Sequence, residues 1–134
     1  MAHPRILIVD DEPSIRQFLA KVFVEAGYEV VEAGNGNEAI LAANRGAVDV
    51  LITDLVMPDK DGLELIRYFR KNLRNVIVIA MSGADLKDTY LNSGRLLGAH
   101  EIIEKPLKSA DIVQRVADLL ARKALARGDV KPER

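Results

Sequence analysis

The sequence predicts an α/β fold with a central parallel sheet. Short segments rich in Val and Ile alternate with longer segments of helical periodicity. Three of the short segments are nearly continuous apolar runs, as expected for strands that are covered on both faces. The chain has 134 residues, of which 49% are apolar, so it has the size of one domain and can bury a core. We therefore expect five strands and five helices in a (βα)5 arrangement, with right-handed crossovers and helices on both faces.

Five short segments are expected to form the strands. Each is rich in β-branched residues, and the third, VDVLITD, ends on an aspartate that has no cation nearby in the sequence. The five segments are residues 5–10, 28–33, 48–54, 75–81 and 100–104.

The helices are predicted from apolar residues at three- and four-residue spacing. The stripes lie at residues 15–23, 39–43, 66–69 and 112–120. Residues 85–97 have the least helical pattern, because a glycine in the interior of a helix costs about 1 kcal/mol relative to alanine.

The bulk composition excludes several classes of function. The 19 Lys and Arg residues against 20 Asp and Glu residues give a net charge of −1, so there is no electrostatic case for nucleic acid or an anionic membrane as the main partner. No disulfide framework is possible without cysteine. No apolar run approaches the roughly 20 residues that span a bilayer. We expect a cytoplasmic domain over residues 1–122, and a tail at 123–134 that ends the last helix or is disordered.

Polar residues gather where the predicted strands end. Asp10 and Asp11 follow the first strand, Asp54 ends the third, Ser82 follows the fourth and Lys105 follows the fifth. In open parallel sheets, ligands bind outside the carboxyl ends of the strands. Taken singly, each residue has a simpler interpretation, since an aspartate or serine can cap a helix and a lysine can be a solvated surface residue. Their joint placement at one edge favours a site.

Three clustered carboxylates require a cation or bound protons. At about 4 Å, two like charges repel by roughly 1 kcal/mol in water and about 4 kcal/mol at an effective dielectric of 20. Mg²⁺ binds one or two carboxylates and fills its remaining positions with water and phosphate oxygens. The residues therefore predict a magnesium site with room for a phosphoryl group.

Four motifs resemble those of a known family. They are ILIVDDEPSIR, LITDLVMPDKDG, the turn at residues 82–84, and GAHEIIEKPL. In this order and spacing they are similar to the receiver domains of response regulators in two-component systems, the CheY-like superfamily, over residues 4–121. The resemblance implies a flavodoxin-like three-layer sandwich with the strand order 2-1-3-4-5.

The resemblance also implies roles for the acidic residues. Asp54 corresponds to the aspartate that accepts a phosphoryl group from the phosphohistidine of a kinase. Asp11 and Asp54 correspond to Mg²⁺ ligands, together with the backbone carbonyl of Val56. Asp10 corresponds to the acid that contacts the ion through water.

Other positions correspond to residues that sense or support the phosphoryl group. Lys105 matches the lysine that pairs with its oxygens, and Ser82 matches the hydroxyl that moves onto it during activation. Lys105 precedes Pro106 in what resembles the cis peptide of the family. Ile102 stands at the switch position that is usually aromatic, so an aromatic rotamer switch cannot operate.

Two further residues are interpreted as structural. Pro58 fixes φ in the loop after the third strand. Gly62 is expected to permit an unusual backbone angle before the third helix.

The implied function is a phosphoacceptor switch that assists its own phosphorylation and dephosphorylation rather than an enzyme. Its partners would be a histidine kinase or a histidine phosphotransfer domain, and a downstream protein at the face formed by the fourth helix, fifth strand and fifth helix. We expect a monomer or weak dimer. Two alternatives remain, namely a docking module that works without phosphorylation and a receiver fragment of a longer regulator. An aspartate-nucleophile phosphatase would need an acid two residues after Asp54, where Val56 stands.

Overall fold

The computed structural model describes residues 3–55, 62–83 and 98–128. Its five strands form one parallel sheet in the order β2-β1-β3-β4-β5, which confirms the predicted fold class. The strands are β1 (Arg5–Val9), β2 (Glu29–Ala33), β3 (Val50–Asp54), β4 (Ile77–Ser82) and β5 (Glu101–Glu104).

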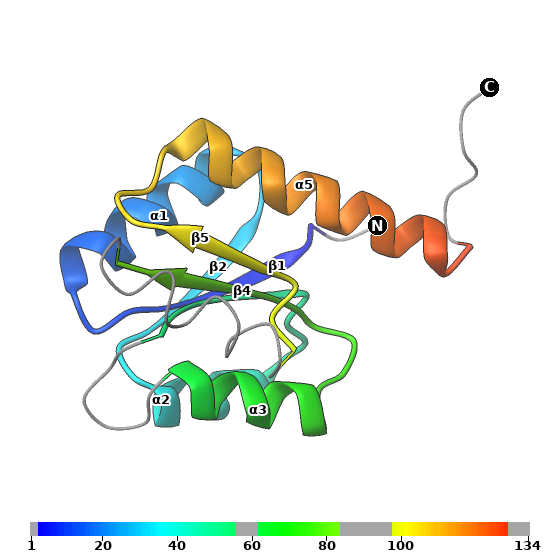
Figure 1. Ribbon diagram of the computed structural model, residues 1–134, viewed down its shortest axis with the longest axis horizontal. Helices are drawn as coiled ribbons and strands as arrows, with labels where there is room; N and C mark the ends of the chain where they lie inside the picture. The colour runs from blue at the N-terminus through cyan, green and yellow to red at the C-terminus, as the bar shows by residue number, and fades with distance from the viewer. Residues whose placement is uncertain (1–2, 56–61, 84–97, 129–134) are drawn as a thin grey trace.

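Helices cover both faces of the sheet in the described part of the chain, with α1 and α5 on one face and α2 and α3 on the other (Figure 1). The helices are α1 (Pro13–Glu25), α2 (Gly36–Arg45), α3 (Gly62–Asn72) and α5 (Ser109–Ala126). The helix predicted at residues 85–97 lies outside the described residues. The last helix runs to Ala126, and its C-terminal end extends beyond the sheet (Figure 1).

The apolar runs are continuous because both faces of the sheet are buried. Alternate residues of a strand point to opposite faces. In β1, Ile6 and Ile8 pack with Phe23 of α1, whereas Leu7 and Val9 lie in the cluster that includes the α3 side chains. All four strand residues are fully buried. Because neither face of such a strand is exposed to solvent, its sequence does not alternate between polar and apolar residues.

The first two helices begin in different ways. Glu12 is the N-cap of α1, although its side chain makes no capping hydrogen bond. Asn35 caps α2 by accepting a hydrogen bond from the Glu38 N–H at 2.9 Å, and Glu38 accepts from the Gly34 N–H at 2.9 Å. The pair resembles a capping box, except that Glu38 bonds the N–H of the residue before the N-cap.

No helix in the described ranges has the length and apolar character that are needed to cross a bilayer.

His100 completes the hydrogen bonding at the start of β5. The Nδ1 of its ring accepts a hydrogen bond from the buried backbone N–H of Val78 at 2.9 Å. The backbone N–H of His100 donates to the Val78 carbonyl at 2.7 Å. Burial lowers the pKa of His100, as does the charge of Arg70. The imidazole therefore accepts the hydrogen bond from Val78 in its neutral form.

Replacing His100 with alanine is expected to destabilise the protein in a pH-dependent way. Above pH 6.5 the variant leaves the Val78 N–H without its acceptor, which costs about 1–3 kcal/mol. Because the folded pKa lies below the ordinary value, the contribution of His100 is present above pH 6.5 and is lost as the pH falls through the folded pKa. Urea unfolding of the native protein and the variant between pH 8 and pH 5 measures the difference. A His3→Ala control should match the native protein throughout, whereas a His100 difference that grows on acidification would contradict the assignment.

Candidate functional site

Three carboxylates meet at the carboxyl ends of β1 and β3. Val9 is paired with Thr53, so the residues that follow, Asp10 and Asp54, leave the sheet side by side. Asp10, Asp11 and Asp54 can each place one oxygen within 4.8 Å of the others. Asp10 is fully buried, Asp54 is 8% exposed, and Asp11 is exposed. The predicted acidic cluster therefore forms, with Asp11 facing solvent.

Lys105 supplies the cation that Asp54 lacks in the sequence. Its Nζ lies 3.1 Å from Asp10 Oδ2 and 3.1 Å from Asp54 Oδ2. The lysine follows β5 and reaches across β4, and its own N–H donates to the Ser82 carbonyl at 2.8 Å. With a side chain that is 19% exposed, it is not a solvated surface lysine, so that simpler interpretation is wrong.

The electrostatics of the site reflect this pairing. Burial acts to lower the pKa of Lys105, but the charges of Asp54 and Asp10 outweigh it, so the pKa is raised and the ammonium form is favoured. Burial raises the pKa of Asp10, although the Glu12 N–H and Lys105 act against it. The Asp10 carboxylate is thus only partly compensated by the protein.

The donor set fits a hard divalent cation. Carboxylate oxygens on neighbouring strand ends are the ligands that Mg²⁺ prefers, and an incompletely compensated buried acid favours a further positive charge. Asp10, Asp11 and Asp54 could each offer an oxygen to such an ion, and Asp10 and Asp54 are also bound to Lys105. The carbonyl of Val56, the third implied ligand, lies outside the described residues.

Ser82 places a buried hydroxyl near this cluster. It is the last residue of β4, and the preceding Met81 is paired with Asp54. Its Oγ is buried and has no hydrogen-bond partner. An unsatisfied buried hydroxyl costs about 1–3 kcal/mol, so the side chain is set to bond an acceptor that enters the site. No helix in the described residues is capped by it, and the capping interpretation gains no support.

Gly62 is required by close packing and not by its backbone angle. The sequence interpretation was wrong on this point, because the positive φ angles belong to other glycines. A Cβ at Gly62 would collide with the Asp54 carbonyl oxygen and lie 2.6 Å from Leu55 Cα. The Gly62 N–H also donates to the Leu55 carbonyl at 3.0 Å. The first residue of α3 thus packs directly against the backbone at Asp54 and Leu55.

Two residues of the site were missed by the sequence analysis. Arg16 donates from Nη1 to the Asp10 carbonyl at 2.8 Å and pairs with Glu32 at 3.2 Å, which ties α1 to the end of β1. Thr53 is fully buried and donates to the Asp54 carbonyl at 3.0 Å. The hydroxyl of Thr53 inside an apolar run was a readable signal, whereas a bond from a side chain to a distant carbonyl leaves no pattern in the sequence.

Three further positions were predicted from the sequence, namely Pro106, Ile102 and Pro58. The Lys105–Pro106 peptide is cis, as the resemblance implies. Ile102 is 8% exposed and packs in the core cluster on the α2 and α3 side of the sheet. Pro58 lies outside the described residues.

Comparison with known proteins gives a family match and a large set of relatives. Residues 6–117 match the family model described as the response regulator receiver domain. The chain is 36% identical over 136 residues to the transcriptional regulatory protein AruR of Pseudomonas aeruginosa, covering 98% of this chain and 55% of AruR. It is 32% identical to the DNA-binding response regulator MtrA of Mycolicibacterium smegmatis, covering 88% of this chain and 51% of MtrA. The chain thus spans about half the length of these curated relatives.

Solved structures show the same fold. A response regulator receiver domain protein from Clostridium thermocellum superposes with a TM-score of 0.84 at 28% identity, covering 92% of this chain and 98% of that one. The chemotaxis protein CheY4 of Vibrio cholerae superposes with a TM-score of 0.81 at 28% identity, covering 87% and 98%.

Proposed function

This chain belongs to the response regulator receiver domain family, and from that premise we propose that it is a phosphoacceptor switch of a two-component phosphorelay. Asp54 takes a phosphoryl group from a phosphohistidine, and the modified domain binds a downstream protein. The observation that carries the proposal is the position of the Lys105 ammonium, 3.1 Å from a carboxylate oxygen of Asp54 and the same distance from Asp10.

The transfer balances as a displacement at phosphorus. An oxygen of the Asp54 carboxylate forms the new P–O bond, and the P–N bond of the donor breaks with its electron pair on nitrogen. The imidazole leaves in its neutral form because its other ring nitrogen carries a proton in the donor. Phosphoryl transfer passes through a loose transition state, so the protein mainly positions the groups and stabilises charge on the equatorial oxygens. A bound Mg²⁺, held by Asp11, Asp54 and the Val56 carbonyl with Asp10 through water, would supply the larger share of that positive charge.

Lys105 and Ser82 respond to the product. Once Asp54 carries the phosphoryl group, the ammonium of Lys105 can pair with its oxygens while it keeps its bond to Asp10. The buried Ser82 hydroxyl gains the acceptor that it lacks. The domain assists its own phosphorylation and dephosphorylation and turns over no separate substrate. The resulting movement near Ser82 and Ile102 would alter the face that binds the downstream partner.

The most direct test uses a small phosphodonor. Acetyl phosphate with Mg²⁺ should add one phosphoryl group to the native chain, seen by intact mass, and none to Asp54→Ala. Asp118→Ala, which alters an exposed aspartate of α5, is the matched control and should be modified like the native chain. Modification that persists in Asp54→Ala, or that is independent of Mg²⁺, would reject the proposal.

A shallow hollow beside the site fits the protein donor. It has a volume of about 470 Å³, and its lining includes Ile15, Phe18, Lys105 and Leu107. Phe18 is 46% exposed, which is unusual for a large apolar side chain. A donor histidine must approach Asp54 past Lys105, so an apolar surface at this place can hold the protein that carries it.

Replacing Phe18 with alanine is expected to separate protein donors from small donors. Transfer from a phosphorylated histidine protein should slow at least tenfold, because truncation of a central apolar contact at an interface costs about 2 kcal/mol. Modification by acetyl phosphate should be unchanged. Val24→Ala, which alters another exposed apolar residue of α1, is the control and should affect neither donor. Equal slowing with both donors would assign Phe18 to folding rather than to docking.

A second candidate rests on the coverage of the relatives. Because the chain spans about half of AruR and MtrA, it corresponds to the receiver part of such regulators. The chemistry at Asp54 is the same in this case, and the partner at the output face would then be a domain of the same protein.

A further inference from the structure

A second hollow lies at the opposite edge of the sheet from Asp54. It has a volume of about 540 Å³ and lies between the C-terminal half of α5, the start of β4 and the turn before β5. Its apolar part is formed by Val76, Ile77, Leu119 and Ala126. In Figure 1 this is the end of the molecule where α5 extends beyond the sheet.

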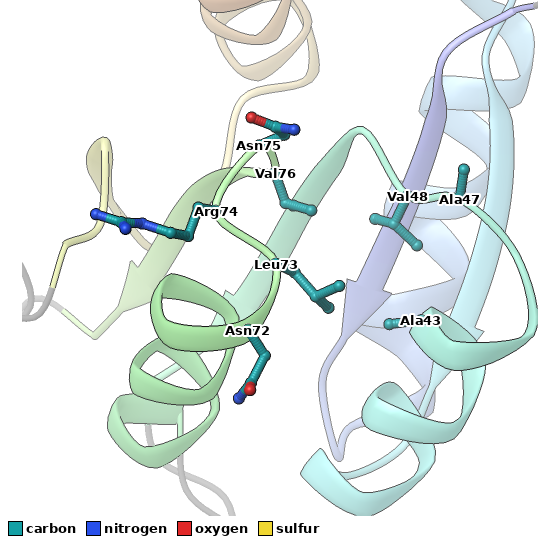
Figure 2. Close-up of a pocket in the computed structure, with 8 residues that line it drawn as sticks. All are labelled: Ala43, Ala47, Val48, Asn72, Leu73, Arg74, Asn75 and Val76. Atoms are coloured by element: carbon teal, nitrogen blue, oxygen red, sulfur yellow. The ribbon is translucent and has the colours of Figure 1, made fainter.

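Cationic side chains surround this apolar part. Arg74 comes from the segment before β4, and Arg122 and Lys123 come from α5. Figure 2 shows a neighbouring pocket, in which Leu73 points toward Ala43 and Val48, whereas Arg74, which also lines that pocket, extends in the other direction. No Asp or Glu is among the described residues that line the hollow.

The cations are held in place and are only partly neutralised. Lys123 donates from Nζ to the Asn75 carbonyl, which fixes the ammonium between α5 and the α3–β4 connection. Burial lowers the pKa of Lys123, and the charge of Arg127 lowers it further. Asp49 acts in the opposite sense, but it is a carboxylate outside the lining, whereas the described lining carries the cations Arg74, Arg122, Lys123 and Arg127. Positive potential therefore remains in the hollow.

His100 adds an uncharged polar group to the lining. Its Nδ1 is occupied by the Val78 N–H, so in the neutral ring the proton is on Nε2, which is a donor. The hollow therefore presents hydrogen-bond donors beside an apolar surface. The chain has almost no net charge, so this local excess of cations is not a consequence of a basic composition.

We propose that this hollow binds a small phosphate-bearing molecule with a flat or apolar portion, of about the size of a nucleotide. Arginine side chains pair with phosphate oxygens through two parallel hydrogen bonds, and Arg74 and Arg122 approach from different elements. The apolar portion would lie over Leu119 and Ala126, the lining apolar residues that retain exposed surface. The volume falls within the range of about 300–1,000 Å³ that is usual for small-molecule sites.

The arrangement favours a small ligand over a nucleic-acid strand. A strand needs cations spread along a groove, with aromatic side chains on which the bases stack. Here the cations converge on one hollow, and no Phe, Tyr or Trp is among the described residues that line it. A ligand bound in the hollow would lie next to the starts of β4 and β5. Ser82 and Lys105 are at the opposite ends of these two strands.

Binding is tested with the full chain and three probes, namely adenosine 5′-diphosphate, inorganic pyrophosphate and adenosine. The experiments are done with EDTA, so that no metal draws phosphate to Asp54. Titration calorimetry should show binding of the diphosphate, weaker binding of pyrophosphate and none of adenosine. Amide NMR signals of Val78 and His100 should shift, while that of Ser82 should not.

Variants assign the binding to this hollow. Arg74→Ala and Arg122→Ala should each weaken binding about tenfold, as expected for the loss of one charge-assisted contact. Arg45→Ala removes the same charge from the exposed end of α2, outside the hollow, and should leave binding unchanged. The proposal is overturned if no probe binds at millimolar concentration, if the three arginine variants behave alike, or if the shifted signals are those around Ser82.

Discussion

Replacing Lys105 with alanine is expected to lower the rate of modification by acetyl phosphate by about 100-fold or more. Mutagenesis of single groups that stabilise transition-state charge gives losses of about 10²–10³. Lys105 is the protein cation that lies 3.1 Å from the Asp54 carboxylate, so its removal takes positive charge from the place where the phosphoryl oxygens must lie. Rates from intact mass at several Mg²⁺ concentrations measure this loss.

Lys105→Ala should also lower the stability of the folded protein. Its melting temperature should respond to Mg²⁺ in a way that a merely misfolded variant would not show. Without Lys105, the buried Asp10 carboxylate keeps its charge but loses its partner, which costs about 3–5 kcal/mol near neutral pH. Mg²⁺ should then raise the melting temperature more than it does in the native protein, because the ammonium no longer competes for Asp54. Lys108→Ala, an exposed lysine three residues later, is the control and should match the native protein in both measurements. A Lys105 variant that is modified at the native rate would contradict the assigned role.

The variant also has a defined pH dependence. Burial already raises the pKa of Asp10 above 3.8, and loss of Lys105 removes a group that lowers it. The cost of the unpaired carboxylate is therefore present at high pH and disappears as the pH falls through the folded pKa. The stability gap between Lys105→Ala and the native protein should shrink on acidification.

Replacing Gly62 with alanine is expected to destabilise the protein and impair phosphorylation together. The new methyl group would meet the Asp54 carbonyl and Leu55 Cα, so α3 or the end of β3 must shift. Such overpacking costs about 1–3 kcal/mol. Because the shift falls on the backbone of the phosphoacceptor, the rate of modification by acetyl phosphate should fall even where urea unfolding shows the protein to be fully folded.

Gly34→Ala provides the matched control for this substitution. A Cβ at Gly34 would meet its nearest neighbours, Arg16 Nη1 and Glu38 Oε1, at ordinary distances of 3.5 and 3.6 Å. Its stability should change by less than about 0.5 kcal/mol and its phosphorylation rate should stay the same. A Gly62 variant that behaves like this control would show that α3 does not support the site.

The parts of the site that the sequence predicts are those carried by strand ends. Asp10, Asp54, Ser82 and Lys105 each follow or end an apolar run, and parallel strands bring their carboxyl ends to one edge. The sequence therefore predicted which groups converge, including the cation for Asp54. It did not predict which acid is buried, because that depends on the helices that cover each strand.

Other features depend on contacts between distant segments. The prediction that Gly62 provides an unusual backbone angle was wrong. The glycine is needed for a close approach of α3 to β3, which has no local signature in the sequence. His100 accepts a hydrogen bond from a residue 22 positions away, and no local sequence pattern indicates this contact. Such pairings are set by strand register and become visible only in the folded chain.

Under the proposed function, carboxylates from separate strands surround a magnesium ion and leave an oxygen of Asp54 to take a phosphoryl group. A crystal structure with Mg²⁺ and beryllofluoride tests it most directly. The ion should be bound by Asp11 and Asp54, with beryllofluoride on Asp54 in contact with Lys105 and the Ser82 hydroxyl. Carboxylates that point apart, or beryllofluoride bound at any other residue, would contradict the account.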